Sequence, residues 1–402
     1  MSAVPLHLAV ALDGAGWHPA AWRDPAASPK DLFTAAYWAG LAAEAERGLL
    51  DFVTIEDSFA LQTTRLDGHD GRTDQVRGRF DAVLTASRIA PLTSRIGLVP
   101  TATTTHTEPF HVAASIATLD YVSTGRAGWR PQVSGRRTEA GHFGRREVPE
   151  LSPEVAAALD DNPHVQDLFG EAGDAIEAVR RLWDSWEDDA IIRDVATGRF
   201  VDRGKLHYID FEGKHFSVRG PSIVPRPPQG QPPVTALAHS RVPYELAARG
   251  ADIAYVTPHD DDQAEAVARQ VREIAAEARA PEAGPLKIFA DLVVFLGETG
   301  EEARGRKARL DEIDGAAYAP DAVIFTGTPG ELAGKLLRWR GLGLEGFRLR
   351  PGVLPADLVA ITRGLVPELQ ARDAFRREYT ATTLRGHLGL SRPASRYAGS
   401  SR

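Results

Sequence analysis

The chain has 402 residues, of which 43% are hydrophobic and 25% are charged, and its formal net charge is -8. This composition is typical of a globular enzyme with a large core, and the negative charge argues against nonspecific nucleic-acid binding, which needs clustered positive charge. The absence of cysteine excludes disulfides, thiolate metal sites, iron–sulfur clusters and cysteine nucleophiles.

Membrane and export signals are missing from the sequence pattern. No uninterrupted apolar segment is long enough to span a bilayer. The chain enters the apolar run Leu6–Leu12 almost directly, without the charged region and apolar core of a signal peptide. We therefore expect a cytoplasmic protein without a membrane partner.

Short apolar runs alternate with helical patterns along most of the chain, which favours parallel βα units. The expected strands are Leu6–Leu12, Asp51–Ile55, Arg95–Val99, Ala127–Val133, Val234–Ala238, Asp252–Val256, Leu286–Leu296 and Gly346–Leu349. The expected helices include Leu32–Arg47, Ala172–Trp186, Arg241–Arg249, Asp262–Ala278 and Pro355–Gln370. This alternation predicts one (β/α)8 TIM barrel over residues 1–390, followed by a tail at 391–402.

Two segments interrupt the alternation and are expected as insertions around the carboxyl mouth of the barrel. Thr138–Pro163 is a long polar connection after the fourth strand, and loops of this length are usually functional or locally disordered. We interpret it as a mobile lid, with a solvated surface excursion as the alternative. Ile191–Gln231 is the second insertion, and within it Lys205–Val218 alternates like a hairpin.

Polar residues follow several expected strands, at the end where barrel enzymes bind ligands. Asp57 follows the second strand and Thr101 the third. His239 and Ser240 follow the fifth strand and precede a helix, so Ser240 and nearby backbone N–H groups suit a phosphate. Each of these residues can instead have a purely structural role. Asp57 and Ser240, for example, are also suited to cap a helix without contacting a ligand.

The histidines offer one candidate catalytic group and no metal site. His106 lies in the polar loop after the third strand, which makes it the candidate. His106 and His111 are five residues apart, which is not the spacing of a helical metal pair. The run Gly341–Gly346 matches G-x-G-x-x-G but lies between a helical pattern and a strand, the reverse of the dinucleotide fingerprint. It is interpreted as a helix C-cap turn.

Several motifs resemble one enzyme family. The runs TEPFH (107–111) and LDYVSTGRAGW (119–129) are similar to the signature of bacterial-luciferase-like flavin monooxygenases, in the nitrilotriacetate monooxygenase branch. Further motifs occur in the family's order, at GWHPAAWR (16–23), LWDSWEDD (182–189), GKHF (213–216) and RPPQG (226–230). The resemblance extends over nearly the whole chain.

This resemblance implies an FMN-dependent monooxygenase that uses reduced flavin and O2 to oxygenate a small organic substrate. Asp57 and Thr101 match flavin-contacting positions, and His239-Ser240 stands where two serines usually contact the phosphate. A separate NAD(P)H flavin reductase is implied, because the chain has no nicotinamide fingerprint. The resemblance also implies a homo-oligomer (a dimer or tetramer). The alternatives are a deazaflavin-dependent oxidoreductase on the same barrel and a non-catalytic flavin-binding protein.

Two departures from the family pattern concern the site. The family's Trp-Asn-Val-Val-Thr-Ser is Trp-Arg-Pro-Gln-Val-Ser at residues 129–134 of this chain. The family's His-x-x-x-Tyr pair falls near Val165 and Phe169, so its tyrosine is missing, and the neighbouring His164 is the expected substitute in cofactor binding.

Overall fold

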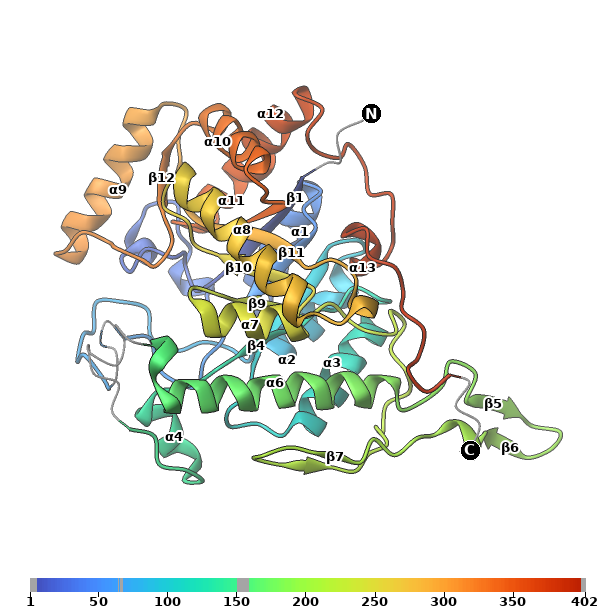
Figure 1. Ribbon diagram of the computed structural model, residues 1–402. Helices are drawn as coiled ribbons and strands as arrows, with labels where there is room; N and C mark the ends of the chain where they lie inside the picture. The colour runs from blue at the N-terminus through green and yellow to red at the C-terminus, as the bar shows by residue number, and fades with distance from the viewer. Residues whose placement is uncertain (1–5, 64, 66–67, 150–158, 399–402) are drawn as a thin grey trace.

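The computed structural model describes residues 6–63, 65, 68–149 and 159–398. Within these residues, eight parallel strands follow one another in the order β4-β3-β2-β1-β13-β11-β10-β9. A parallel bridge between Trp129 and Val234 joins β4 to β9 and closes the ring, so the predicted TIM barrel is confirmed (Figure 1). The strands are β1 (His7–Leu12), β2 (Phe52–Ile55), β3 (Gly97–Thr103), β4 (Arg130–Gln132), β9 (Thr235–Leu237), β10 (Ile253–Val256), β11 (Lys287–Leu296) and β13 (Gly346–Pro351).

The strands are buried on both faces, between the barrel interior and the outer helices. Every residue of β1, β2 and β13 is buried, which is why β1 and β2 appear as mostly apolar runs rather than alternating ones. The main outer helices are α1 (Ala35–Arg47), α2 (Ala82–Ile89), α3 (Pro109–Val122), α6 (Pro163–Asp184), α7 (Arg241–Gly250), α8 (Asp261–Ala278), α9 (Gly300–Asp314), α10 (Pro329–Gly341), α11 (Ala356–Ala360) and α12 (Val366–Ala371). None of the helices described here is long and apolar enough to cross a membrane.

Two element boundaries and one additional strand differ from the sequence prediction in ways that bear on the site. β3 continues to Thr103, so Thr101 lies inside the strand instead of after it; β-branched threonines suit an extended backbone. α6 begins at Pro163, because the Asn162 side chain accepts hydrogen bonds from the first free N–H groups of the helix. A further strand, β12 (Ile324–Gly327), pairs with the end of β11 and was not predicted.

The insertion after β4 keeps its predicted place at the carboxyl mouth. It contains the short helix α4 (Arg137–Phe143) and a 3-10 turn at Leu159–Asp161. Residues 150–158 lie outside the described residues, so the lid interpretation remains a prediction.

The second insertion is not at the mouth, which corrects the sequence prediction. Outer helices of a βα barrel run back to the amino edge of the sheet, and this insertion starts where α6 ends. Arg180, near the end of α6, pairs with Asp252 just before β10 (2.8 Å), which identifies that edge. The insertion forms two antiparallel hairpins (Figure 1), of which the second confirms the expected alternation. Their strands are β5 (Ile191–Asp194) with β6 (Arg199–Val201), and β7 (Phe211–Glu212) with β8 (Ser217–Val218).

Candidate active site

The barrel interior contains an ion-pair network that begins on β13. Alternate residues Arg348 and Arg350 are both almost fully buried, and a buried guanidinium needs a charged partner. Asp291 of β11 supplies it, since one carboxylate oxygen accepts from Arg348 Nε (2.8 Å) and the other from Arg350 Nε (3.0 Å). Burial opposes ionisation of Asp291, but the two guanidinium groups lower its pKa to about 2. Asp291 therefore compensates one of the two positive charges of β13 inside the barrel.

The network continues from Arg348 to the predicted flavin-contacting threonine. Arg348 Nη1 donates to Glu56 Oε1 (2.9 Å), and Glu56 Oε2 accepts from Arg130 Nη2 (2.6 Å). Arg130 Nε then donates to Thr101 Oγ1 (3.0 Å). Arg130 is 2% exposed and Thr101 1%, so this part of the network is buried. Arg130, where the resemblance predicts asparagine, is the residue that holds the Thr101 hydroxyl.

From Arg350 the network extends to the predicted phosphate side. Arg350 Nη1 donates to Asp321 Oδ1 (2.6 Å), and the second oxygen of Asp321 lies 3.6 Å from His239 Nε2. His239 Nδ1 lies 3.0 Å from Thr257 Oγ1, at the end of β10. Burial lowers the pKa of His239. One continuous series of contacts thus joins Thr101 to His239 across the barrel.

Asp57 lies at the mouth, as predicted, and caps a helix. Its carboxylate accepts hydrogen bonds from Ala82 N (2.9 Å), at the start of α2, and from Ser58 N (2.7 Å). Burial raises the pKa of Asp57. The fold therefore gives Asp57 a structural role at the start of α2, and its contact with the flavin stays a prediction.

His106 forms part of an aromatic wall at the mouth. Its ring stacks on Phe143 of α4 with a centroid separation of 4.9 Å and an angle of 12°, and Phe59 meets the edge of Phe143 at 4.9 Å. His106 is only 6% exposed, and its Nε2 has no hydrogen-bond partner among the described residues. Burial lowers its pKa, which favours the neutral ring. A buried polar nitrogen without a partner is unfavourable in the free protein, so this atom is suited to a ligand.

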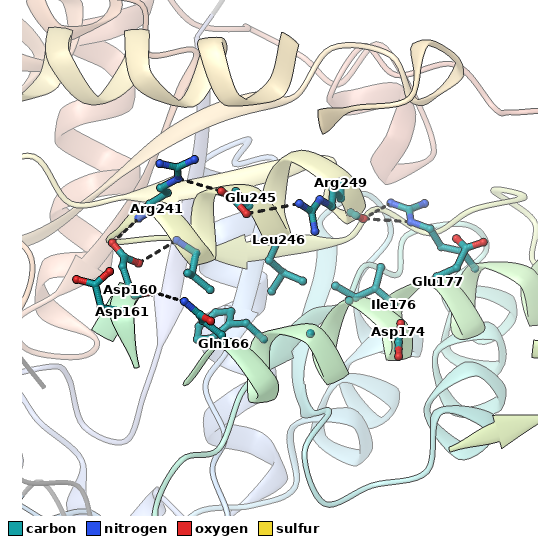
Figure 2. Close-up of a pocket in the computed structure, with 16 residues that line it drawn as sticks. Asp160, Asp161, Gln166, Asp174, Ile176, Glu177, Arg241, Glu245, Leu246 and Arg249 are labelled. Atoms are coloured by element: carbon teal, nitrogen blue, oxygen red, sulfur yellow. Dashed lines mark hydrogen bonds and ion pairs between the residues drawn. The ribbon is translucent and has the colours of Figure 1, made fainter. Parts of the chain in front are cut away.

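Ser240 and the start of α7 form an anion cradle, and a carboxylate of the chain lies in it. Asp160 Oδ1 accepts from Ser240 Oγ (2.8 Å) and Val242 N (2.9 Å), and Oδ2 accepts from Arg241 N (3.1 Å). Figure 2 shows Asp160 and Arg241 at one end of a groove of about 840 Å³ between α6 and α7. Burial acts to raise the pKa of Asp160, but the hydrogen bonds from Val242, Ser240 and Arg241 lower it overall.

His164 lies in the first turn of α6, apart from the hydrogen bonds of this cradle. Its backbone N–H donates to Asn162 Oδ1 (2.9 Å), and its side-chain Nε2 has no partner within the described part of the chain. Phe169, at the position of the missing tyrosine, lines the same groove as Asp160 and Val242. The groove therefore has an apolar ring at the position where the resemblance predicts a tyrosine.

Comparison with known proteins decides the family. The family model for luciferase-like monooxygenases matches residues 15–322. The chain belongs to this family. It is 32% identical to N-acetyl-S-(2-succino)cysteine monooxygenase of Bacillus subtilis over 98% of both chains. It is also 32% identical to nitrilotriacetate monooxygenase component A of Aminobacter aminovorans, over 95% of this chain and 96% of the relative. The crystal structure of riboflavin lyase with modified FMN has a TM-score of 0.82 at 25% identity and covers 98% of each chain.

This luciferase-like monooxygenase has site residues that sequence reasoning missed. The pattern Phe347-Arg348-Leu349-Arg350 carries a signal, because two arginines alternate within an otherwise apolar strand. Asp291 is likewise one acid in a buried apolar run. Asp160 gave no comparable signal, because an acid before a helix is ordinarily a local cap.

Proposed function

We propose that this monooxygenase uses reduced FMN and O2 to oxygenate a small organic substrate. The observation that carries the proposal is the cradle of Ser240 and α7, which holds the Asp160 carboxylate at the end of a barrel strand. Phosphate groups bind at helix N-termini through the same combination of hydroxyl and backbone N–H donors. The donor set therefore fits the phosphate end of FMN.

The candidate residues at the mouth have different roles in this proposal. When bound, the reduced flavin supplies the electrons that activate O2. Ser240 and the N–H groups of Arg241 and Val242 hold the phosphate, with His239 beside them, and Asp57 and Thr101 contact the ring. His106 Nε2 hydrogen-bonds the reacting molecules, while its aromatic wall excludes water. We assign His164 a place near the phosphate.

The reduced flavin comes from a separate NAD(P)H-dependent flavin reductase in this proposal. The relative from Aminobacter is named as one component of a nitrilotriacetate monooxygenase. Two different subunits of pristinamycin IIA synthase from Streptomyces pristinaespiralis are also relatives, at 30% and 32% identity over 96% and 46% of this chain. These names support a multicomponent arrangement, and we propose a homodimer or homotetramer for the oxygenase itself. Nitrilotriacetate and N-acetyl-S-(2-succino)cysteine are the first substrates to assay.

Ser240→Asp tests the phosphate site. The substitution places a second negative charge beside the phosphate, so we expect FMN binding to weaken at least about tenfold, the effect of about one pKa unit of repulsion. Fluorescence quenching measures the affinity, with riboflavin, which has no phosphate, as the matched ligand. Unchanged FMN affinity in a folded variant would place the phosphate elsewhere.

A further inference from the structure

We propose that Asp160 is a built-in competitor of the cofactor phosphate: its carboxylate fills the α7 cradle in the flavin-free protein and leaves when phosphate binds. The inference rests on the proposed FMN function and adds a residue that sets the affinity for the phosphate. Asp160 belongs to the 3-10 turn before α6, 80 residues before Ser240 in sequence.

The first argument is that Asp160 uses the donors that a phosphate needs. Its carboxylate accepts from Ser240 Oγ, Val242 N and Arg241 N, at 2.8 to 3.1 Å. Two anions cannot share these donors without strong repulsion. Binding of a phosphate at this point therefore requires displacement of the carboxylate.

The second argument is that α7 is not capped locally. Ser240 occupies the N-cap position, yet its side chain makes no capping hydrogen bond to α7 and instead donates to Asp160. A serine at this position normally satisfies the free N–H groups of its own helix. The first N–H groups of α7 are thus left for an anion from outside the helix.

The third argument is that hydrogen bonds, rather than an ion pair, hold Asp160. Arg241 directs its guanidinium to Glu245 (3.0 Å), away from Asp160, and no ion pair of Asp160 occurs among the described residues. Asp160 is also partly exposed, so the displaced carboxylate would be hydrated. A phosphate monoester carries more charge than a carboxylate at neutral pH and interacts more strongly with the positive end of the helix dipole.

Asp160→Asn tests the competition, because it removes the charge and keeps the shape. We expect FMN to bind about tenfold more tightly to this variant, because the competing negative charge is lost; tenfold in affinity corresponds to about one pKa unit of interaction. Riboflavin affinity should stay within about twofold of wild type. Asp161→Asn is the matched control: it makes the same charge change one residue away, on an exposed side chain without a hydrogen bond to α7 in the described structure. Its FMN affinity should stay close to wild type.

A second measurement needs no variant. In wild-type protein crystallised with FMN, the Asp160 carboxylate should lie outside hydrogen-bond distance of Val242 N, with phosphate oxygens in its place. An Asp160 that keeps its three hydrogen bonds in the loaded protein would overturn the inference.

The binding results separate this inference from the proposed function. Weaker FMN binding in Ser240→Asp together with unchanged or weaker binding in Asp160→Asn would overturn the competition alone. If neither substitution alters FMN affinity, the phosphate does not bind at α7, and both the inference and the proposed phosphate site fail.

Discussion

Asp291→Asn is expected to lower the free energy of unfolding by about 3–5 kcal/mol, the usual cost of removing one partner from a buried ion pair. Asp291 is fully buried between Arg348 and Arg350, which are 0% and 2% exposed. Without the negative charge of Asp291, the positive charges of the two buried guanidinium groups are no longer balanced in the barrel. Urea denaturation followed by circular dichroism measures the loss.

Asp373→Asn is the control for this experiment. Asp373 forms an ion pair with Arg377, but its side chain is 89% exposed, and exposed pairs contribute little. Its unfolding midpoint should match wild type. A wild-type midpoint for Asp291→Asn as well would contradict the assigned role of the network.

The same carboxylate gives a pH dependence with a defined sign. The pKa of Asp291 is about 2 in the folded protein, below its ordinary value of 3.8. Its stabilisation is therefore fully present above about pH 4 and is lost as the pH falls towards 2. The Asn variant should lose less stability than wild type over this interval.

His106→Ala is expected to lower the rate of substrate oxygenation about 10²-fold, the lower end of the effect of a positioned acid–base group. The reason is the buried, unpartnered Nε2 of His106 at the mouth. FMN affinity should change much less, since the proposed phosphate contacts are elsewhere. Single-turnover product formation from reduced FMN and O2 separates rate from binding.

His142→Ala is the matched control, because His142 lies on the exposed face of α4. Its rate should equal that of wild type. Because burial lowers the pKa of His106 below 6.5, any acid limb that this residue causes should lie below pH 6.5 and disappear in His106→Ala. Equal rates in His106→Ala and wild type would remove His106 from the candidate catalytic groups.

The fold could be predicted because buried parallel strands leave a signal in the local sequence. Runs such as Leu6–Leu12 are apolar at successive positions, since both faces of the strand are covered. The prediction was less accurate where a strand contains polar residues that point into the barrel, as at the end of β3 around Thr101. Placing the second insertion also required the direction of α6, which the local pattern does not contain.

The site could be predicted only in part, because a helix cap and a ligand contact need the same residue types. Asp57 and Ser240 both lie at helix N-termini, and Asp57 accepts a hydrogen bond from the first N–H group of α2, whose N-cap residue is Asp81. The network around Asp291 depends on pairing with Arg348, which is 57 residues away in sequence. The position of Asp160 depends on the packing of α6 against α7, which no local pattern encodes.

The most direct test measures whether an oxygen atom from O2 enters the product when the source of reduced FMN is controlled. The purified protein is mixed anaerobically with reduced FMN and an assay substrate, and then with ¹⁸O2. The account predicts a product containing one ¹⁸O atom, formed with chemically reduced FMN and also when NAD(P)H is supplied with a separate flavin reductase, but not with NAD(P)H alone. Two results would contradict it: substrate oxidation without O2 that reduces an oxidised deazaflavin, or a protein that binds FMN and oxygenates neither the assay substrates nor related compounds.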